Sequence, residues 1–156
     1  MRITLMECGK TRDPFIKEGV ELFHKRLIHY VPFKTETLPD LKKTRNLSMK
    51  EVQNQEAALM LKRLKSSDYV VLLDERGKEY NSISFAEHLN ALEGRVNHLV
   101  FVIGGPYGFS EEIYQRAQAR ISLSKLTFSH QLVRVIFMEQ LYRAYTILKG
   151  EPYHHS

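Results

Sequence analysis

The residues best suited to chemistry lie in the last third of the chain, in two loops that follow strand-like runs. Residues 103–108 read Ile-Gly-Gly-Pro-Tyr-Gly, and residues 123–131 read Leu-Ser-Lys-Leu-Thr-Phe-Ser-His-Gln. Glycines let the backbone approach a ligand closely, and the second loop offers backbone amides and hydroxyl groups. Because ligands of open α/β sheets bind outside the carboxyl ends of strands, these two loops predict a ligand cradle.

His130 stands between the second loop and a long apolar helix that the sequence predicts over residues 132–149. Its ring is expected near whatever the loop binds, although a lone histidine is more often structural than catalytic. Arg134 and Arg143 follow on the same helix, nine residues apart, which places them on roughly opposite sides. Two interpretations stay open: one arginine faces the ligand and the other a partner subunit, or each has only a structural carboxylate such as Glu139 as its partner.

Several other kinds of site are not supported. The glycine loop lacks the Lys-Ser/Thr of a phosphate-binding loop and the spacing of a dinucleotide site. None of the seven histidines shows a metal-ligand spacing with a nearby carboxylate or cysteine, so we predict no metal. Ser110 lacks the context of a nucleophile elbow. The single cysteine, Cys8, excludes an internal disulfide and is expected to be a small buried side chain at a strand end.

The elements that must position these residues alternate along the chain. Strand-like runs at residues 3–8, 33–38, 69–73, 99–103 and 121–123 are separated by helical patterns. Helix starts are predicted at Asp13-Pro14, at Ser110, and at the capping boxes that begin at Ser48 and Ser84. This order predicts an α/β fold with a mainly parallel sheet flanked by helices. Residues 70–73 and 99–103 are apolar throughout, so we expect those two strands to be central.

The 156 residues fit a single domain, 1–156, with a net charge of +5. That charge favours an anionic partner and a merely solvated basic surface about equally. The basic loop at residues 39–47 is expected to be solvated rather than bound to phosphate. No apolar run is long enough to cross a bilayer and no secretory signal is evident, so we predict a cytoplasmic protein without membrane contact. The helix at 132–149 is apolar on two sides, which indicates either deep burial or, as we favour, a homodimer interface.

Together these segments resemble the ribosomal RNA large subunit methyltransferase H family, small members of the SPOUT methyltransferases. The resemblance covers essentially the whole chain. It rests on several linked motifs in the same order, which are Cys8-Gly9-Lys10, Leu73-Asp74-x-x-Gly77-Lys78, Ile103-Gly104-Gly105-x-x-Gly108, the run from Leu123 to Val135, Glu139-Gln140-x-Tyr142-Arg143-Ala144 and Pro152-Tyr153-His154.

The resemblance implies a C-terminal deep trefoil knot (the SPOUT fold) and a homodimer with the knots at its interface. It implies S-adenosylmethionine as cofactor and methylation at N3 of a pseudouridine in large-subunit (23S) rRNA on the assembled 70S ribosome. The positions that match the family's cofactor site are Leu73, Gly104, Gly105, Leu123, Ser124, Lys125, Leu126, Thr127 and Phe128.

Catalytic roles can be assigned by the same resemblance. His130 would act as base or orient the base ring, and Arg143 would stabilise negative charge on the imide oxygens. Tyr153 and His154 would close over the target nucleotide. The family usually has proline where Ser129 stands, so we expect a looser turn before His130. Relatives more often have lysine or arginine at the position of His155, which leaves the role of this second histidine open.

Three alternatives remain at this point. A SPOUT-type enzyme acting on tRNA would methylate deproteinised tRNA. A non-catalytic ribosome-binding module would bind ribosomes but not the cofactor. A nucleotide hydrolase is the weakest alternative, because the sequence has neither metal-binding carboxylates nor a phosphate loop.

Overall fold

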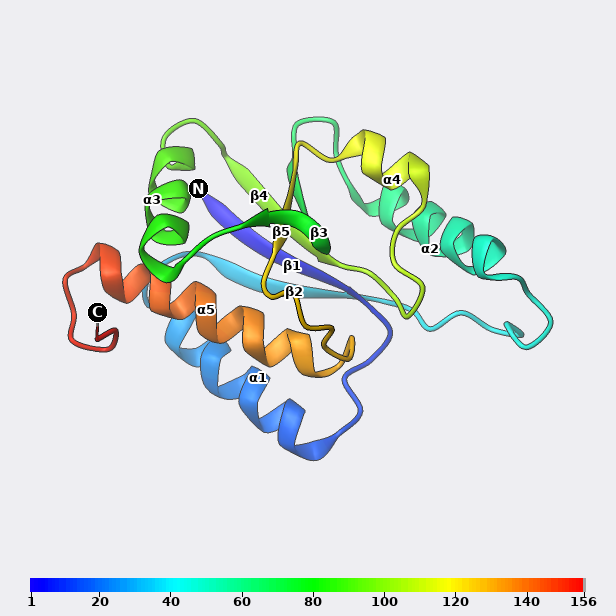
Figure 1. The fold of residues 1–156 in the computed structure, drawn as a ribbon, viewed down its shortest axis with the longest axis horizontal. Coiled ribbons are helices and arrows are strands. Elements are labelled where there is room, and N and C mark those ends of the chain that lie inside the picture. Colours follow the sequence, from blue (N-terminus) through cyan, green and yellow to red (C-terminus); the bar gives the residue numbers. More distant parts are fainter. Residues whose placement is uncertain (156) are drawn as a thin grey trace.

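The computed structural model describes residues 1–155, and Ser156, the last residue of the predicted domain, lies outside the described residues. A five-stranded sheet has the order β2-β1-β4-β3-β5, and every pair of neighbouring strands is parallel (Figure 1). The predicted α/β class and parallel sheet are confirmed. In chain order the elements are β1 (Arg2–Cys8), α1 (Pro14–Leu27), β2 (Phe33–Leu38), α2 (Met49–Arg63), β3 (Tyr69–Glu79), α3 (Ser82–Leu92), β4 (His98–Ile103), α4 (Glu111–Arg116), β5 (Ala119–Ser122) and α5 (Leu132–Leu148).

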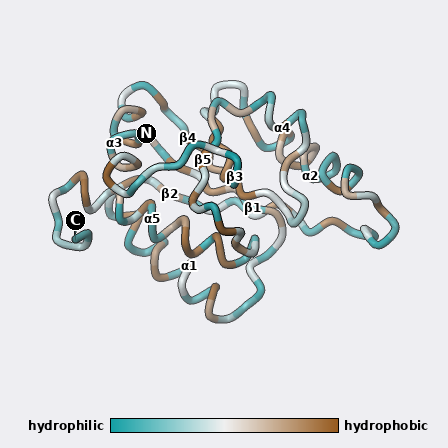
Figure 2. Tube along the Cα trace, in the orientation of Figure 1, coloured by the Kyte–Doolittle hydropathy of each residue, from teal (hydrophilic) through white to brown (hydrophobic). Residues whose placement is uncertain are grey.

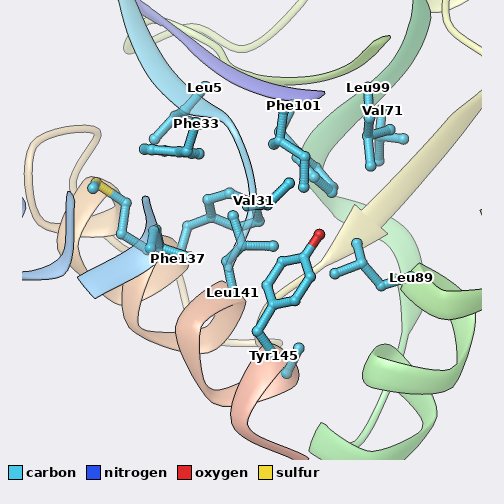
Figure 3. Packing of buried hydrophobic residues seen from close by; sticks show 14 of the residues in the cluster. Leu5, Val31, Phe33, Val71, Leu89, Leu99, Phe101, Phe137, Leu141 and Tyr145 are labelled. Carbon is cyan, nitrogen blue, oxygen red and sulfur yellow. The ribbon is translucent and has the colours of Figure 1, made fainter. Parts of the chain in front are cut away.

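Helices cover both faces of this sheet. Alternate side chains of a strand point to opposite faces, so Leu5 joins the core under α1, α3 and α5 while Met6 joins the core under α2 and α4. Figure 3 shows Phe137, Leu141 and Tyr145 of α5 directed toward the side chains of the core that lies under α1, α3 and α5. As predicted, β3 and β4 lie inside the sheet and carry fully buried apolar runs.

Most of the predicted helix starts are correct. Pro14 begins α1, and the Ser48 hydroxyl caps α2 by accepting from the Glu51 amide at 3.1 Å. The box predicted at Ser84 is wrong, because α3 begins three residues earlier than that serine implies. Asn81 is the N-cap, and its side chain accepts from the Ser84 amide at 2.8 Å while the Ser84 hydroxyl accepts from the Asn81 amide at 3.0 Å. Ser84 is therefore the third residue of a capping box rather than its first.

The third strand is longer than the sequence indicated. We predicted that it ends at residue 73, but β3 continues to Glu79 with a shift of register, so that both Leu73 and Lys78 lie opposite Ile121. Gly77 makes this irregularity possible, since a Cβ there would lie 2.6 Å from backbone atoms of Arg120 and Ile121. Because of this shift, residues 74–76 are not paired with β5. This lifted segment of β3 lies at the carboxyl edge of the sheet.

Replacing Gly77 by alanine is expected to destabilise the protein by about 1–3 kcal/mol, the usual cost of forcing extra atoms into a packed site. The added methyl would collide with the β5 backbone, which cannot move without breaking its pairing with β3. Urea unfolding followed by circular dichroism measures the change. Lys78→Ala, at the next and exposed position, is the control and should shift the free energy of unfolding much less.

The two apolar sides of α5 are mostly covered within the chain. Phe137, Met138, Leu141 and Ala144 are buried, whereas Leu148 keeps 37% of its surface exposed. Figure 2 shows hydrophobic positions recurring along both α1 and α5, the two helices that pack together on this face. Deep burial, one of the two predicted explanations, thus accounts for most of the pattern. None of the helices formed by residues 1–155 is long and apolar enough to cross a membrane.

Candidate active site

The carboxyl ends of four strands meet at one edge of the sheet. The pairing aligns Glu7 with Ile103, Ile103 with Leu73, and Leu73 with Ile121. After β1 the chain continues to β2, toward one edge of the sheet, and after β4 it continues to β5, at the opposite edge. Such a reversal opens a crevice at the strand ends, where ligands of doubly wound sheets bind.

A cavity of about 740 Å³, here called the first cavity, occupies this edge. The glycine loop, the loop at residues 123–131 and the lifted segment of β3 surround it. Lys125 is exposed and does not line the cavity. The predicted cofactor-site residues that do line it are Leu73, Gly104, Gly105, Leu123, Ser124, Leu126, Thr127 and Phe128.

The lifted segment of β3, which the Leu73-Asp74-x-x-Gly77-Lys78 motif spans, adds polar lining. The Tyr114 hydroxyl donates to Asp74 and accepts from Arg76 at 2.8 Å, and Glu75 accepts from the Thr127 hydroxyl at 2.9 Å. The last contact ties β3 to the loop at residues 123–131. Tyr114 belongs to the short helix α4, and nothing in its local sequence indicates a position beside a ligand cavity.

Hydroxyl groups shape the loop that leads to His130. The Ser124 hydroxyl accepts from the Leu126 amide at 2.9 Å, and the Ser129 hydroxyl accepts from the Leu132 amide at 3.1 Å. We expected Ser129 to loosen this turn, because it stands where relatives have proline. The turn is instead tied by a hydrogen bond that proline could not make, since its side chain carries no acceptor.

His130 lies at the junction of two cavities and lines both. Burial lowers the pKa of its imidazole below the ordinary value, and the positive charges of Arg134 and Arg12 lower it further, with Asp40 acting in the opposite direction. The ring is therefore mainly neutral at pH 7. A neutral imidazole beside a ligand cavity can accept a proton.

Arg134 is fully buried and lines neither cavity. Its guanidinium donates to the carbonyl oxygens of Cys8 at 2.8 Å and Gly9 at 2.9 Å, and it pairs with Glu7 at 3.3 Å. It also donates to the carbonyl oxygen of His130. The structural carboxylate of this arginine is thus Glu7 rather than Glu139, and Arg134 fastens the His130 turn to the end of β1.

The second cavity, of about 440 Å³, lies beyond His130 at the ends of β1 and β2. Pro106, Tyr107 and His130 line both cavities. Glu56 of α2 lines the second one, with only 6% of its surface exposed and with no hydrogen-bond partner for Oε1. Burial raises the pKa of this carboxyl to about 7, against a smaller lowering by the Cys8 thiol.

Cys8 itself is a poor nucleophile. Burial and the negative charge of Glu56 raise the pKa of the thiol to about 12, so it carries its proton at neutral pH. Cys8 is thus no reactive group, as expected, but it is half-buried at the end of β1 rather than buried as predicted.

Replacing Glu56 by glutamine is expected to stabilise the protein at pH 8 but not at pH 5. The carboxyl has a pKa of about 7 when folded and 4.5 ordinarily, so between these values ionisation increasingly favours the unfolded state. The wild type therefore loses stability as the pH rises through this window, by up to about 3 kcal/mol at 1.36 kcal/mol per unit. Glutamine never ionises. Urea unfolding at both pH values measures the difference, and Glu87→Gln on the exposed face of α3 controls for the lost charge.

The remaining predicted catalytic residues form a separate cluster at the C-terminus. Arg143 donates to Glu139 at 2.6 Å, its guanidinium lies 4.8 Å from the centre of the Tyr153 ring, and it contacts His154 at 3.1 Å. The Tyr153 hydroxyl also donates to Glu139, at 3.0 Å. Glu139, named above as a possible structural partner, is thus the carboxylate that pairs with Arg143. The described part of the tail is packed against α5.

This cluster and the cavities lie at opposite ends of α5. Of the described residues of that helix, only Val133 in its first turn lines either cavity. Arg143 is eleven residues from the first residue of α5, or about 16 Å along the axis at 1.5 Å per residue. Figure 1 shows the loop that carries His130 at one end of α5 and the C-terminal tail at the other. One chain therefore brings His130 to the predicted cofactor residues but leaves Arg143, Tyr153 and His154 apart from them.

Among residues 1–155, no group of three or more histidine, cysteine, aspartate and glutamate side chains could hold a metal ion. Several polar groups that line the first cavity are instead engaged with one another, namely those of Asp74, Arg76 and Tyr114 and those of Glu75 and Thr127.

Comparison with known proteins agrees with the geometry. The model of a family described as "Predicted SPOUT methyltransferase" matches residues 1–154. A protein of Christiangramia forsetii named ribosomal RNA large subunit methyltransferase H is 52% identical, with 99% of each chain covered. One of the same name from Parabacteroides distasonis is 51% identical, with 100% of each chain covered. A solved structure of a probable methylase family protein from Haemophilus influenzae shares the fold, with a TM-score of 0.55 at 11% identity over 95% of this chain and 66% of that chain.

Proposed function

This chain belongs to the SPOUT methyltransferases, in the family of ribosomal RNA large subunit methyltransferase H, and from that premise we propose that it transfers a methyl group from S-adenosylmethionine to large-subunit rRNA. We further propose N3 of a pseudouridine on the assembled 70S ribosome, in the cytoplasm, as the position methylated. The observation that carries the proposal is the first cavity, which gathers eight of the nine residues that match the family's cofactor site.

The residues of this cavity fit the proposed cofactor. Its volume of about 740 Å³ is within the range of cavities that bind ligands of this size. Gly104 packs closely against the Phe109 ring in the wall of the cavity, since a Cβ there would lie 3.2 Å from that ring. When bound, S-adenosylmethionine supplies an activated methyl group, so the protein has to position the reactants and manage one proton.

His130, at the cavity, and the Arg143 cluster, at the far end of α5, divide these tasks. An imide nitrogen must lose its proton to accept a methyl group, and neutral His130 is placed to receive it. The negative charge that develops on the imide oxygens then requires a cation, for which Arg143 is the proposed residue. Tyr153, in contact with Arg143, and His154 would close over the nucleotide. Arg134 contributes by holding the His130 turn in place.

A single chain leaves this proposed site incomplete, and we propose a homodimer in which the tail of one subunit completes the site of the other. The support is the separation along α5 between the cavities and the Arg143 cluster. Exposed hydrophobic side chains on α1 and α5, among them Phe15 at 65% and Leu22 at 46% exposure, could be covered by the partner. The trefoil knot stays a prediction of the family resemblance.

Calorimetric titration with S-adenosylmethionine tests the cofactor assignment. We expect one site per subunit with the product S-adenosylhomocysteine as competitor, and no binding of ATP. If the protein bound ribosomes but neither of these two ligands, the non-catalytic binding module would replace the enzyme as the better reading.

A further inference from the structure

Resting on this proposed function, we propose that the second cavity receives the target base and that the Glu56 carboxyl donates to a carbonyl oxygen of its imide group. The first cavity is assigned to the cofactor, and the second shares Pro106, Tyr107 and His130 with it. A base in the second cavity would meet the methyl group at this junction. His130, the proposed proton acceptor, stands at the same point.

The burial of Glu56 is what points to a ligand. A carboxyl group with 6% of its surface exposed and one oxygen without a partner is costly, because the hydrogen bond from the Cys8 thiol offsets its desolvation only in part. Buried polar groups in folded proteins are nearly always paired. The Cys8 thiol contacts the Glu56 carboxyl, but Oε1 has no partner among the described residues, and the second cavity lies beside it.

The chemistry of the carboxyl selects an imide. A protonated carboxyl offers an O–H donor, which matches a carbonyl oxygen of the imide and leaves the ring N–H free to give its proton to His130. The raised pKa, about 7, keeps a large share of the group protonated at neutral pH. A protonated acid that donates to an imide oxygen also stabilises the charge that appears when the ring nitrogen is deprotonated.

The rim of the second cavity suits a nucleotide rather than a free base. Arg12 lines it with a side chain that is 70% exposed and paired with Asp40 at 3.1 Å. An exposed guanidinium can contact a backbone phosphate, which fixes the register of a nucleic acid. Tyr107, 46% exposed, offers a ring for stacking at the junction.

Glu56→Ala and Glu56→Gln test the assignment in single-turnover methylation of unmodified 70S ribosomes, alongside calorimetric titration of S-adenosylmethionine. Removal of one group that stabilises developing charge costs about 10²–10³-fold in rate. We expect Glu56→Ala to lose this much with an unchanged cofactor dissociation constant. Glu56→Gln, whose amide still donates a hydrogen bond, should stay within about tenfold of wild type.

A second pair of variants avoids the buried position. Thr44 lines the second cavity from an exposed loop, whereas Asn46 in the same loop is exposed and does not line it. Thr44→Trp should fill the cavity and abolish methylation with cofactor affinity intact, and Asn46→Trp should leave the rate within about twofold of wild type, as most surface substitutions do.

Three results would overturn the assignment. If Glu56→Ala and Thr44→Trp both methylate at the wild-type rate, the base lies elsewhere while the proposed enzyme stands. If Glu56→Ala weakens cofactor binding in parallel with the rate, Glu56 supports the neighbouring Gly105 rather than the base. If wild type itself transfers no methyl group to ribosomes, the proposed function has failed and this inference falls with it.

Discussion

Mixing two inactive variants, His130→Ala and Arg143→Ala, is expected to restore methylation. If each site combines the cavity of one subunit with the tail of the other, each variant homodimer has two broken sites. A heterodimer has one site with both residues intact. Random exchange makes half of the dimers heterodimers, so activity should reach about a quarter of the wild-type value in a twofold-symmetric assembly.

The mixture is prepared by denaturing and refolding the two variants together, and methyl transfer to 70S ribosomes is compared with that of each variant refolded alone. A mixture of His130→Ala with the double variant His130→Ala/Arg143→Ala is the matched control, since no pairing of these chains yields an intact site. Recovery no greater than in the control would mean that the tail acts within its own subunit, or that the chain works as a monomer.

Replacing Arg143 alone by alanine is expected to slow methyl transfer by about 10²–10³-fold, as the loss of one preorganised charge-stabilising group does. The dissociation constant of S-adenosylmethionine should change little, because Arg143 lies far along α5 and lines neither cavity. Arg143→Lys keeps the charge but not the planar fork that contacts Glu139 and His154, so an intermediate rate is expected.

Lys149→Ala is the control for this substitution, because Lys149 is an exposed cation just beyond the end of the same helix. Its rate should remain within about twofold of wild type. A parallel loss of rate and thermal stability in Arg143→Ala would assign the residue a purely structural role in holding the tail.

The elements that surround the first cavity could be predicted because their signals are local. The apolar run at residues 99–103 followed by glycines marks a buried strand and a close turn, and Ser48 with Glu51 marks a helix start. Near residues 81–84 the local pattern fits two helix starts. The prediction took Ser84 as the N-cap, whereas Asn81 is the N-cap in the structure. The strand end at Leu73 was also predicted too early, because Gly77 acts through its approach to β5, a contact between residues more than forty positions apart.

The second cavity could not be predicted, because its key groups come from separate elements. Glu56 reads locally as one more polar residue of an amphipathic helix, and only the packing of α2 places it beside Gly105. Arg134 likewise finds Glu7 across 127 positions of sequence. Two interpretations for the arginines therefore stayed open until the fold placed one at the end of β1 and the other beside the tail.

The most direct test of the central claim is methyl transfer from labelled S-adenosylmethionine to intact 70S ribosomes that lack the modification. Isolated 50S subunits and deproteinised tRNA are assayed in parallel, and the labelled nucleotide is mapped by mass spectrometry. We predict label at N3 of one pseudouridine of large-subunit rRNA, on 70S ribosomes and not on tRNA. Label on tRNA alone, or no label on any RNA with cofactor binding intact, would contradict the assigned substrate.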